Sequence, residues 1–226
     1  MSERPAAAPA STAPPIRVVW FKRDLRVADH PPLTAALSQP DAASRRPVIA
    51  LYAFEPSLLA APETDRGHLA FICASLAELQ VELSHLGIPL VIVHAEVADV
   101  LDRLHARVPI EELHSHEETG LEVTWARDRA VAAWSARTGV TWREHRAFGV
   151  VRGLRNRDGW GSRWNQFMAE PPAPVPAPQP PVPGPMWQAV AQAVDFVAGP
   201  WGTGAPAGLG ALGAGVALGV TEAVGA

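Results

Sequence analysis

The sequence has one cysteine, one tyrosine and, among its 19 basic residues, one lysine. A lone cysteine, Cys73, excludes an internal disulfide and any metal site built from several cysteines. Because arginine replaces lysine almost throughout, we attribute the arginine content to coding bias and not to phosphate binding. The net charge of -4 excludes a general attraction to nucleic acid, so such a partner would need a local basic patch.

The sequence also has no long, continuous hydrophobic run. Residues 1–15 are proline-rich and have no apolar segment typical of a signal peptide, so we expect a disordered leader and a cytoplasmic protein. The uncharged stretch 201–221 contains seven glycines and one proline, which disfavours a membrane span. A G-x-G-x-x-G pattern within 208–213 follows no predicted strand, so we do not expect a nucleotide site there.

Strand and helix patterns alternate from residue 16 to residue 145. Short apolar segments predict strands, and apolar residues three or four positions apart predict helices. The expected strands are 16–21, 47–54, 88–95, 111–116 and 139–145, and the expected helices are 32–37, 66–86, 97–104 and 123–138. This alternation predicts a doubly wound, Rossmann-like α/β domain with five parallel strands and helices on both faces.

Four charged residues follow the first expected strand directly: Lys22, Arg23, Asp24 and Arg26. In doubly wound sheets, ligands bind beyond the carboxyl ends of the strands. The position of this charged group therefore predicts one wall of a binding site. A structural loop, in which Asp24 pairs with Arg23 or Arg26, is the alternative.

The alternation stops after Phe148, so we place the α/β domain at 16–150. Residues 151–170 mix arginine with tryptophan, and we expect a connector that packs on a partner domain or binds single-stranded nucleic acid. The proline-rich residues 171–185 predict an extended linker. Residues 186–226 are rich in glycine and alanine, and we expect a disordered, low-complexity tail that buries no core.

Several motifs resemble the DNA photolyase/cryptochrome family. The segment VVWFKRDLRVADHPPL (18–33) is similar to the family's V-W-F-R-R-D-L-R-x-x-D-N-P-A-L, with His30 in place of asparagine. VIALYAFEPSLL, the long helix from Arg66 and SHEETGLEVTWARDRAVAAW also resemble family segments. The resemblance covers about residues 16–170.

The resemblance implies an N-terminal antenna domain that holds a light-harvesting chromophore, which is a folate, a deazaflavin or a flavin. In the family, a helical domain holds FAD, binds DNA and supports light-driven repair or blue-light sensing. No segment after Gln179 resembles that domain, so we do not expect this chain alone to bind FAD or to be catalytic. A separate helical FAD domain is then an expected partner. The alternative is a non-catalytic flavin- or nucleotide-binding module left by truncation or a frameshift.

Matching the family motifs position by position implies a chromophore site at Lys22, Arg23, Asp24, Tyr52, Glu55, Arg66 and Glu117. Tyr52 offers a stacking face, and the two glutamates can accept hydrogen bonds from a ring N–H or from ribityl hydroxyls. The basic members of the set can neutralise a phosphate or an acidic tail. A core position for Tyr52, and solvated loop positions for the glutamates, are the alternatives.

The same resemblance bears on which chromophore is bound. Folate-binding members carry an asparagine–glutamate pair where this chain has Val123 and Thr124. We therefore expect a deazaflavin or a flavin in preference to folate. The HSHEE motif at 114–118 contains two histidines, but no third ligand with suitable spacing is evident, so we expect no metal.

Overall fold

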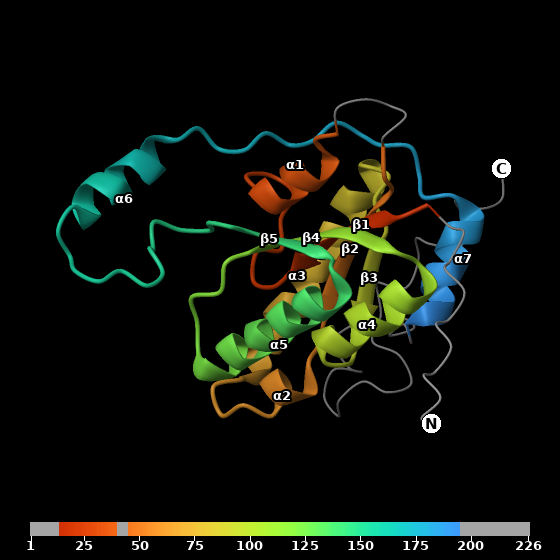
Figure 1. The fold of residues 1–226 in the computed structure, drawn as a ribbon, viewed down its shortest axis with the longest axis horizontal. Helices are drawn as coiled ribbons and strands as arrows, with labels where there is room; N and C mark the ends of the chain where they lie inside the picture. Colours follow the sequence, from red (N-terminus) through yellow and green to blue (C-terminus); the bar gives the residue numbers. More distant parts are fainter. Residues whose placement is uncertain (1–13, 40–44, 195–226) are drawn as a thin grey trace, which may run out of the picture.

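The computed structural model describes residues 14–39 and 45–194 (Figure 1). Its centre is a sheet of five strands: β1 (Ile16–Phe21), β2 (Val48–Ala53), β3 (Leu90–Val93), β4 (Ile110–His116) and β5 (Thr141–His145). All pairs are parallel, and the strand order is β3-β2-β1-β4-β5. The winding direction reverses between β1 and β4, so the predicted doubly wound α/β fold is confirmed.

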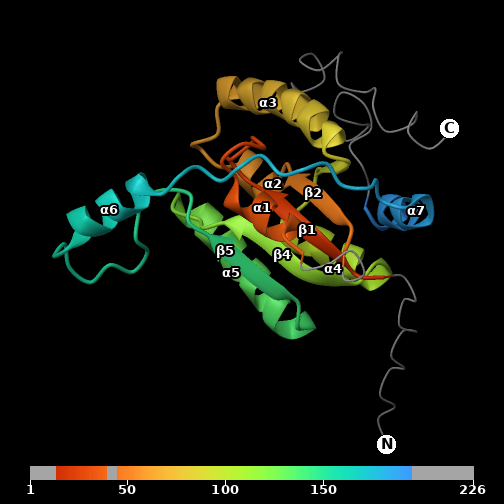
Figure 2. The same ribbon diagram turned by 90° about the horizontal axis from the view of Figure 1, so that it is seen from above.

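Helices cover both faces of this sheet. The helices are α1 (Pro31–Leu37), α2 (Pro56–Leu59), α3 (Arg66–His85), α4 (Val97–Arg107), α5 (Glu122–Thr138), α6 (Trp160–Ala169) and α7 (Gly184–Ala193). Figure 2 shows α3 on one side of the sheet and α4 and α5 on the other. Alternate residues of β1 supply the two cores, because Val19 and Phe21 pack with α1 and α3, whereas Val18 and Trp20 pack with α4, α5 and α7.

The long helix α3 has clear start and stop signals. The Asp65 side chain accepts a hydrogen bond from the backbone N–H of Gly67, which caps the first turn. At the other end, Gly87 has a φ of +74°, a left-handed conformation that costs glycine little. These two signals set the two ends of α3.

The chain beyond β5 differs from the sequence-based expectation. Residues 171–183 run back across the domain from α6 to α7 (Figure 1), and the backbone N–H of Gln179 donates to the carbonyl of Leu86 at 2.8 Å. Helix α7 then buries Met186 and Val190 in the core shared with α4. Residues 186–194 are therefore part of the packed domain, and the tail predicted from residue 186 is wrong for them.

Other expectations fall on residues 1–13 and 195–226, outside the described residues; these are most of the leader, the glycine motif and the rest of the tail. Over the described ranges, no helix combines the length and the apolar character that crossing a membrane requires.

Candidate functional site

A group of acidic and basic side chains lies at the carboxyl ends of β1, β2 and β4, beside the start of α5. Lys22, directly after β1, donates from Nζ to Asp128 Oδ2 at 2.7 Å and to the carbonyl oxygen of His116 at 3.0 Å. Its ammonium also lies 4.3 Å from the ring centroid of Trp20. Lys22 and Asp128 are both buried, so this ion pair is shielded from water.

Arg127, on α5, connects the acidic side chains of this group. Its guanidinium lies 2.6 Å from Glu118 Oε2, 3.0 Å from Asp128 Oδ1 and 3.4 Å from Glu55 Oε2. One arginine thus ties the end of β2 to the loop after β4. Because buried carboxylates require partners, Arg127 is the central residue of the group.

Glu118 is held from several directions. Its Oε1 accepts hydrogen bonds from the Arg23 guanidinium at 2.6 Å and from the backbone N–H groups of Thr119 and Gly120 at 2.9 and 2.7 Å. A Cβ atom at Gly120 would lie 2.8 Å from this oxygen, so the loop approaches the carboxylate as only glycine allows. The loop after β4 is therefore shaped around Glu118.

The surroundings shift the pKa values of these groups in different directions. Burial raises the pKa of Glu55 to about 7, although the Arg127 charge opposes the change. Burial also lowers the pKa of Lys22, against the attraction of Asp128. For Glu118, burial would raise the pKa, but Arg23 and Arg127 outweigh it and hold the value below the usual range. With a pKa of about 7, Glu55 changes charge near neutral pH.

Beside this group lies a cavity of about 220 Å³. Its apolar wall comes from the end of β2 and from α3, and includes Tyr52, Phe54 and Ile72. Its polar wall contains members of the charged group, among them Arg23 and Arg127. A flat, partly polar molecule is the kind of ligand that fits an apolar wall facing fixed charges.

The seven residues implied by the resemblance do not all lie at the strand-end cavity. Four of them line the cavity: Lys22, Arg23, Tyr52 and Glu55. Of the other three, Arg66 is exposed at the first position of α3. Glu117 lies away from the strand-end cavity, 3.4 Å from Arg152, because consecutive residues leaving a strand point to opposite sides.

Asp24, the third of these residues, faces a different set of partners. Its Oδ2 accepts hydrogen bonds from His30 Nε2 at 2.7 Å and from His116 Nδ1. Burial would raise the pKa of Asp24, but the bonds to His116 and His30 outweigh it and hold the pKa well below its ordinary value. The structure thus gives Asp24 a role in positioning the loop, with partners other than the arginines considered from the sequence.

Asp24, His30 and His116 bring three metal-type ligand atoms within 4.8 Å of one another. The hydrogen bonds argue against coordination, however. His30 Nδ1 accepts from the backbone N–H of Leu33 at 3.1 Å, so the ring proton lies on Nε2 and is donated to Asp24. A metal at Nε2 would require loss of that proton. His30 therefore serves as a helix cap for α1 and as a donor to Asp24.

Three members of the charged group were not identified from the sequence: Glu118, Arg127 and Asp128. Arg127 shares a helix face with Val131 and Trp134, four and seven positions later, and this spacing was the available signal. Glu118 is adjacent to Glu117, which was chosen in its place. A one-residue error reverses the side to which a residue points at the end of a strand.

Comparison with known proteins identifies the family. The model of the family described as DNA photolyase matches residues 17–152, which is more than half of the chain. The chain belongs to the DNA photolyase family. The match covers β1 to β5 and therefore the whole charged group.

The chain is similar to part of several photolyase-family proteins. It is 34% identical over 121 residues to cryptochrome DASH of Gloeobacter violaceus, covering 51% of this chain and 23% of that protein. It is 44% identical over 85 residues to deoxyribodipyrimidine photo-lyase of Salmonella typhimurium, covering 38% of this chain and 17% of that protein. The chain thus spans less than a quarter of these relatives.

Solved structures confirm the fold. A cryptochrome from Synechocystis sp. PCC6803 aligns with a TM-score of 0.57 at 18% identity, over 76% of this chain and 40% of that one. A photolyase from Sulfolobus tokodaii, described with two FAD molecules and a novel light-harvesting cofactor, aligns with a TM-score of 0.55 at 22% identity, over 71% and 36%.

Proposed function

We propose that the strand-end cavity holds a light-harvesting chromophore, a deazaflavin or a flavin in preference to folate. The chain would then act as the antenna part of a system for light-dependent DNA repair or blue-light sensing. Electron transfer and DNA binding would belong to a helical FAD domain. The single observation that supports this proposal most strongly is a cavity lined both by the aromatic rings of Tyr52 and Phe54 and by the charged side chains of Arg23 and Arg127.

The cavity has the chemistry that a fused ring needs. Tyr52 and Phe54 meet edge to face, with ring centroids 5.1 Å apart, and form a rigid aromatic wall. Ile72 and Leu69 from α3 extend that wall. At about 220 Å³ the cavity is smaller than the ~300–1,000 Å³ typical of enclosed ligands, so the ring would keep one edge outside.

The polar wall supports a flavin-like ligand in particular. Arg23 has a side chain that is 65% exposed, and its guanidinium is fixed by buried Glu118. It can therefore donate to a ring carbonyl or a phosphate without losing its own partner. Thr124, where folate-binding relatives carry an acidic residue, also lines the cavity and offers only a hydroxyl. This difference supports a flavin or deazaflavin. The two-FAD description of the Sulfolobus photolyase is consistent with such an antenna.

Filling the cavity tests the proposal. The purified chain would be titrated with FMN and with a 5-deazaflavin, and binding would be followed by the change in chromophore fluorescence. Ile72→Trp puts an indole into the cavity and should weaken binding by at least about tenfold. Val81→Trp makes the same kind of change on the exposed surface of α3, where Val81 is 56% exposed, and should leave binding unchanged.

Three results would count against the proposal. If the wild-type chain binds neither FMN nor the 5-deazaflavin, the proposal is wrong. If Ile72→Trp and the wild type bind with equal affinity, the ligand occupies a site other than the strand-end cavity. Tighter binding of a reduced folate than of either flavin would reverse the choice of chromophore. As a control, thermal unfolding of both variants is followed by circular dichroism to test whether they are folded.

A further inference from the structure

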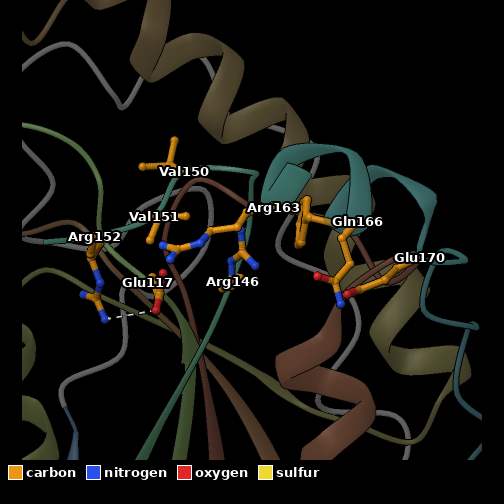
Figure 3. Close-up of a pocket in the computed structure, with 9 residues that line it drawn as sticks. Glu117, Arg146, Val150, Val151, Arg152, Arg163, Gln166 and Glu170 are labelled. Atoms are coloured by element: carbon orange, nitrogen blue, oxygen red, sulfur yellow. Dashed lines mark ion pairs between the residues drawn. The ribbon is translucent and has the colours of Figure 1, made fainter. Parts of the chain in front are cut away.

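A second cavity, of about 290 Å³, lies between the end of β5 and α6, apart from the charged group at the strand ends. Its lining combines three arginines and a glutamine with two glutamates and three apolar residues; these are Arg146, Arg152, Arg163, Gln166, Glu117, Glu170, Val150, Val151 and Phe167. In Figure 3 the side chains of Arg146 and Arg163 lie between the Arg152–Glu117 pair on one side and Gln166 and Glu170 on the other. Its volume is close to the ~300 Å³ at which typical ligand cavities begin.

The arginines of this cavity differ in their partners. Arg152 lies 2.8 Å from Glu144 and 3.4 Å from Glu117, so its charge is already balanced. Within residues 14–39 and 45–194, neither Arg146 nor Arg163 forms an ion pair. Two guanidinium groups thus line the cavity without a carboxylate of the described residues within ion-pair distance, although Glu170 is also in the lining.

Arg146 shows the strongest sign of a missing ligand. Its guanidinium lies 4.6 Å from the ring centroid of Phe167, which fixes its position. Its Nη2 atom is buried and has no hydrogen-bond partner among the described residues. A buried, charged donor without an acceptor is costly, and native proteins rarely leave one so. An anionic acceptor in the cavity would satisfy it.

We propose that this cavity binds the terminal phosphate of a small molecule. Two unpaired guanidinium groups match the two charges and several acceptor oxygens of a phosphate monoester, and Gln166 can donate to a third oxygen. A phosphodiester carries one charge per group and requires an open groove along which a strand can pass. The limited volume between the β5 end and α6 therefore favours a small molecule over a nucleic acid strand.

Helix α6 also offers a surface for the rest of such a molecule. Trp160 and Trp164 lie on α6, the helix that also carries Arg163 and Gln166. Their ring centroids are 5.5 Å apart, and the two residues are 42% and 36% exposed. Trp164 packs directly on the backbone of Gly149, where a Cβ atom would lie 2.1 Å from its ring. A planar group attached to the phosphate can stack on these exposed indoles.

The experiment measures phosphate binding by calorimetry in a buffer free of phosphate and sulfate. The probes are inorganic phosphate, adenosine 5′-monophosphate, adenosine, and a single-stranded oligonucleotide without terminal phosphates. We expect inorganic phosphate and the monophosphate to bind with dissociation constants at or below about 1 mM, the monophosphate more tightly. Adenosine and the oligonucleotide should not bind measurably under the same conditions.

Charge variants identify the site. Arg163→Gln, at an exposed position, should weaken phosphate binding by about tenfold. Arg157→Gln removes the same charge from an exposed residue outside the cavity and should change the affinity by less than about twofold. Glu170→Gln removes a carboxylate from the cavity lining and should strengthen binding several-fold.

The proposal fails if phosphate does not saturate the wild-type chain at about 10 mM. It also fails if Arg157→Gln weakens binding as much as Arg163→Gln, because the effect is then one of general surface charge. Binding of the oligonucleotide alone would replace the small-molecule site with a nucleic-acid surface. These outcomes are independent of chromophore binding, because Ile72→Trp should leave phosphate binding unchanged.

Discussion

Arginine side chains have different surroundings in the α/β body and in the segment that follows it. In the α/β body, residues 16–145, Arg127 is buried and contacts three carboxylates. In the segment that follows, Arg146 and Arg163 face a cavity without an ion pair among the described residues. The difference teaches that arginine content says little about ligand binding until the acidic partners are known. Buried Arg127 holds the fold together through its carboxylates, whereas Arg146 and Arg163 have no such partners in the part of the chain that the structure describes.

The body can be summarised as a balanced set of charges. Three cations, Lys22, Arg23 and Arg127, face three carboxylates that belong to Glu55, Glu118 and Asp128. Most of these side chains are buried, so each member depends on the others for the polar contacts that water would otherwise supply. The strand-end cavity is therefore rigid before any ligand enters, which reduces the cost of binding.

Removing the central arginine of the body should have the largest effect. Arg127→Leu leaves three carboxylates short of one cation and should lower the free energy of unfolding by about 3–5 kcal/mol. Arg137→Leu, on the same helix, breaks an exposed pair with Asp102 and should cost at most about 1 kcal/mol. Urea unfolding followed by circular dichroism measures both. If both variants lose a similar amount of unfolding free energy, buried ion pairs of arginine stabilise this fold no more than exposed ones.

The body should also show a pH dependence that originates at Glu55. The pKa of this carboxyl is about 7 in the folded chain against 4.5 in the unfolded chain, so the folded state holds the proton more tightly. Its stabilising contribution is complete below pH 4.5 and is lost as the pH rises through 7. At its full extent this amounts to about 3 kcal/mol.

Glu55→Gln isolates this contribution from the other titrating groups. His145, whose pKa burial and the neighbouring His114 lower to about 4, changes stability in the opposite direction over part of the same range. The difference in unfolding free energy between wild type and Glu55→Gln cancels the histidine contribution. We expect the wild type to lose stability relative to the variant between pH 4.5 and 7. A constant difference across that range would show that Glu55 titrates normally.

The regular part of the fold was predictable because its signals are local. The apolar run of β1, the spacing of α3 and the glycine at 87 each depend on neighbouring residues only. Helix α7 was missed, although Met186, Val190 and Val194 recur every four residues, because proline and glycine dominate the composition around it. A short apolar pattern acquires meaning only when a surface such as α4 is there to cover it.

The site was predictable only in part, for a different reason. The rule that ligands bind beyond the strand ends led to the charged group after β1, which includes Lys22 and Arg23. The family resemblance implied Tyr52 and Glu55, and all four residues line the cavity. The partners of Lys22 and Glu55 come from α5, and the partner of Arg23 comes from the loop before it. Arg127 lies more than 70 positions from Glu55 along the chain, and no local pattern pairs the two. Charge pairing across a fold is a tertiary property, so it requires coordinates.

The smallest expected effect concerns the contact between the body and the proline-rich segment. Asp29 has a φ of +47°, and its Oδ1 accepts a hydrogen bond from the backbone N–H of Ala173 at 3.0 Å. Asp29→Ala removes that acceptor at an exposed position and should cost about 1 kcal/mol or less. Hydrogen exchange at the Ala173 amide should accelerate by about fivefold. Asp29→Asn keeps the oxygen and tolerates the left-handed backbone, so the Ala173 amide of this variant should exchange at the wild-type rate.

The Gln179 amide, bonded to Leu86, serves as an internal reference. If both amides accelerate together in Asp29→Ala, the segment opens as one unit; if neither does, Asp29 does not hold it to the body.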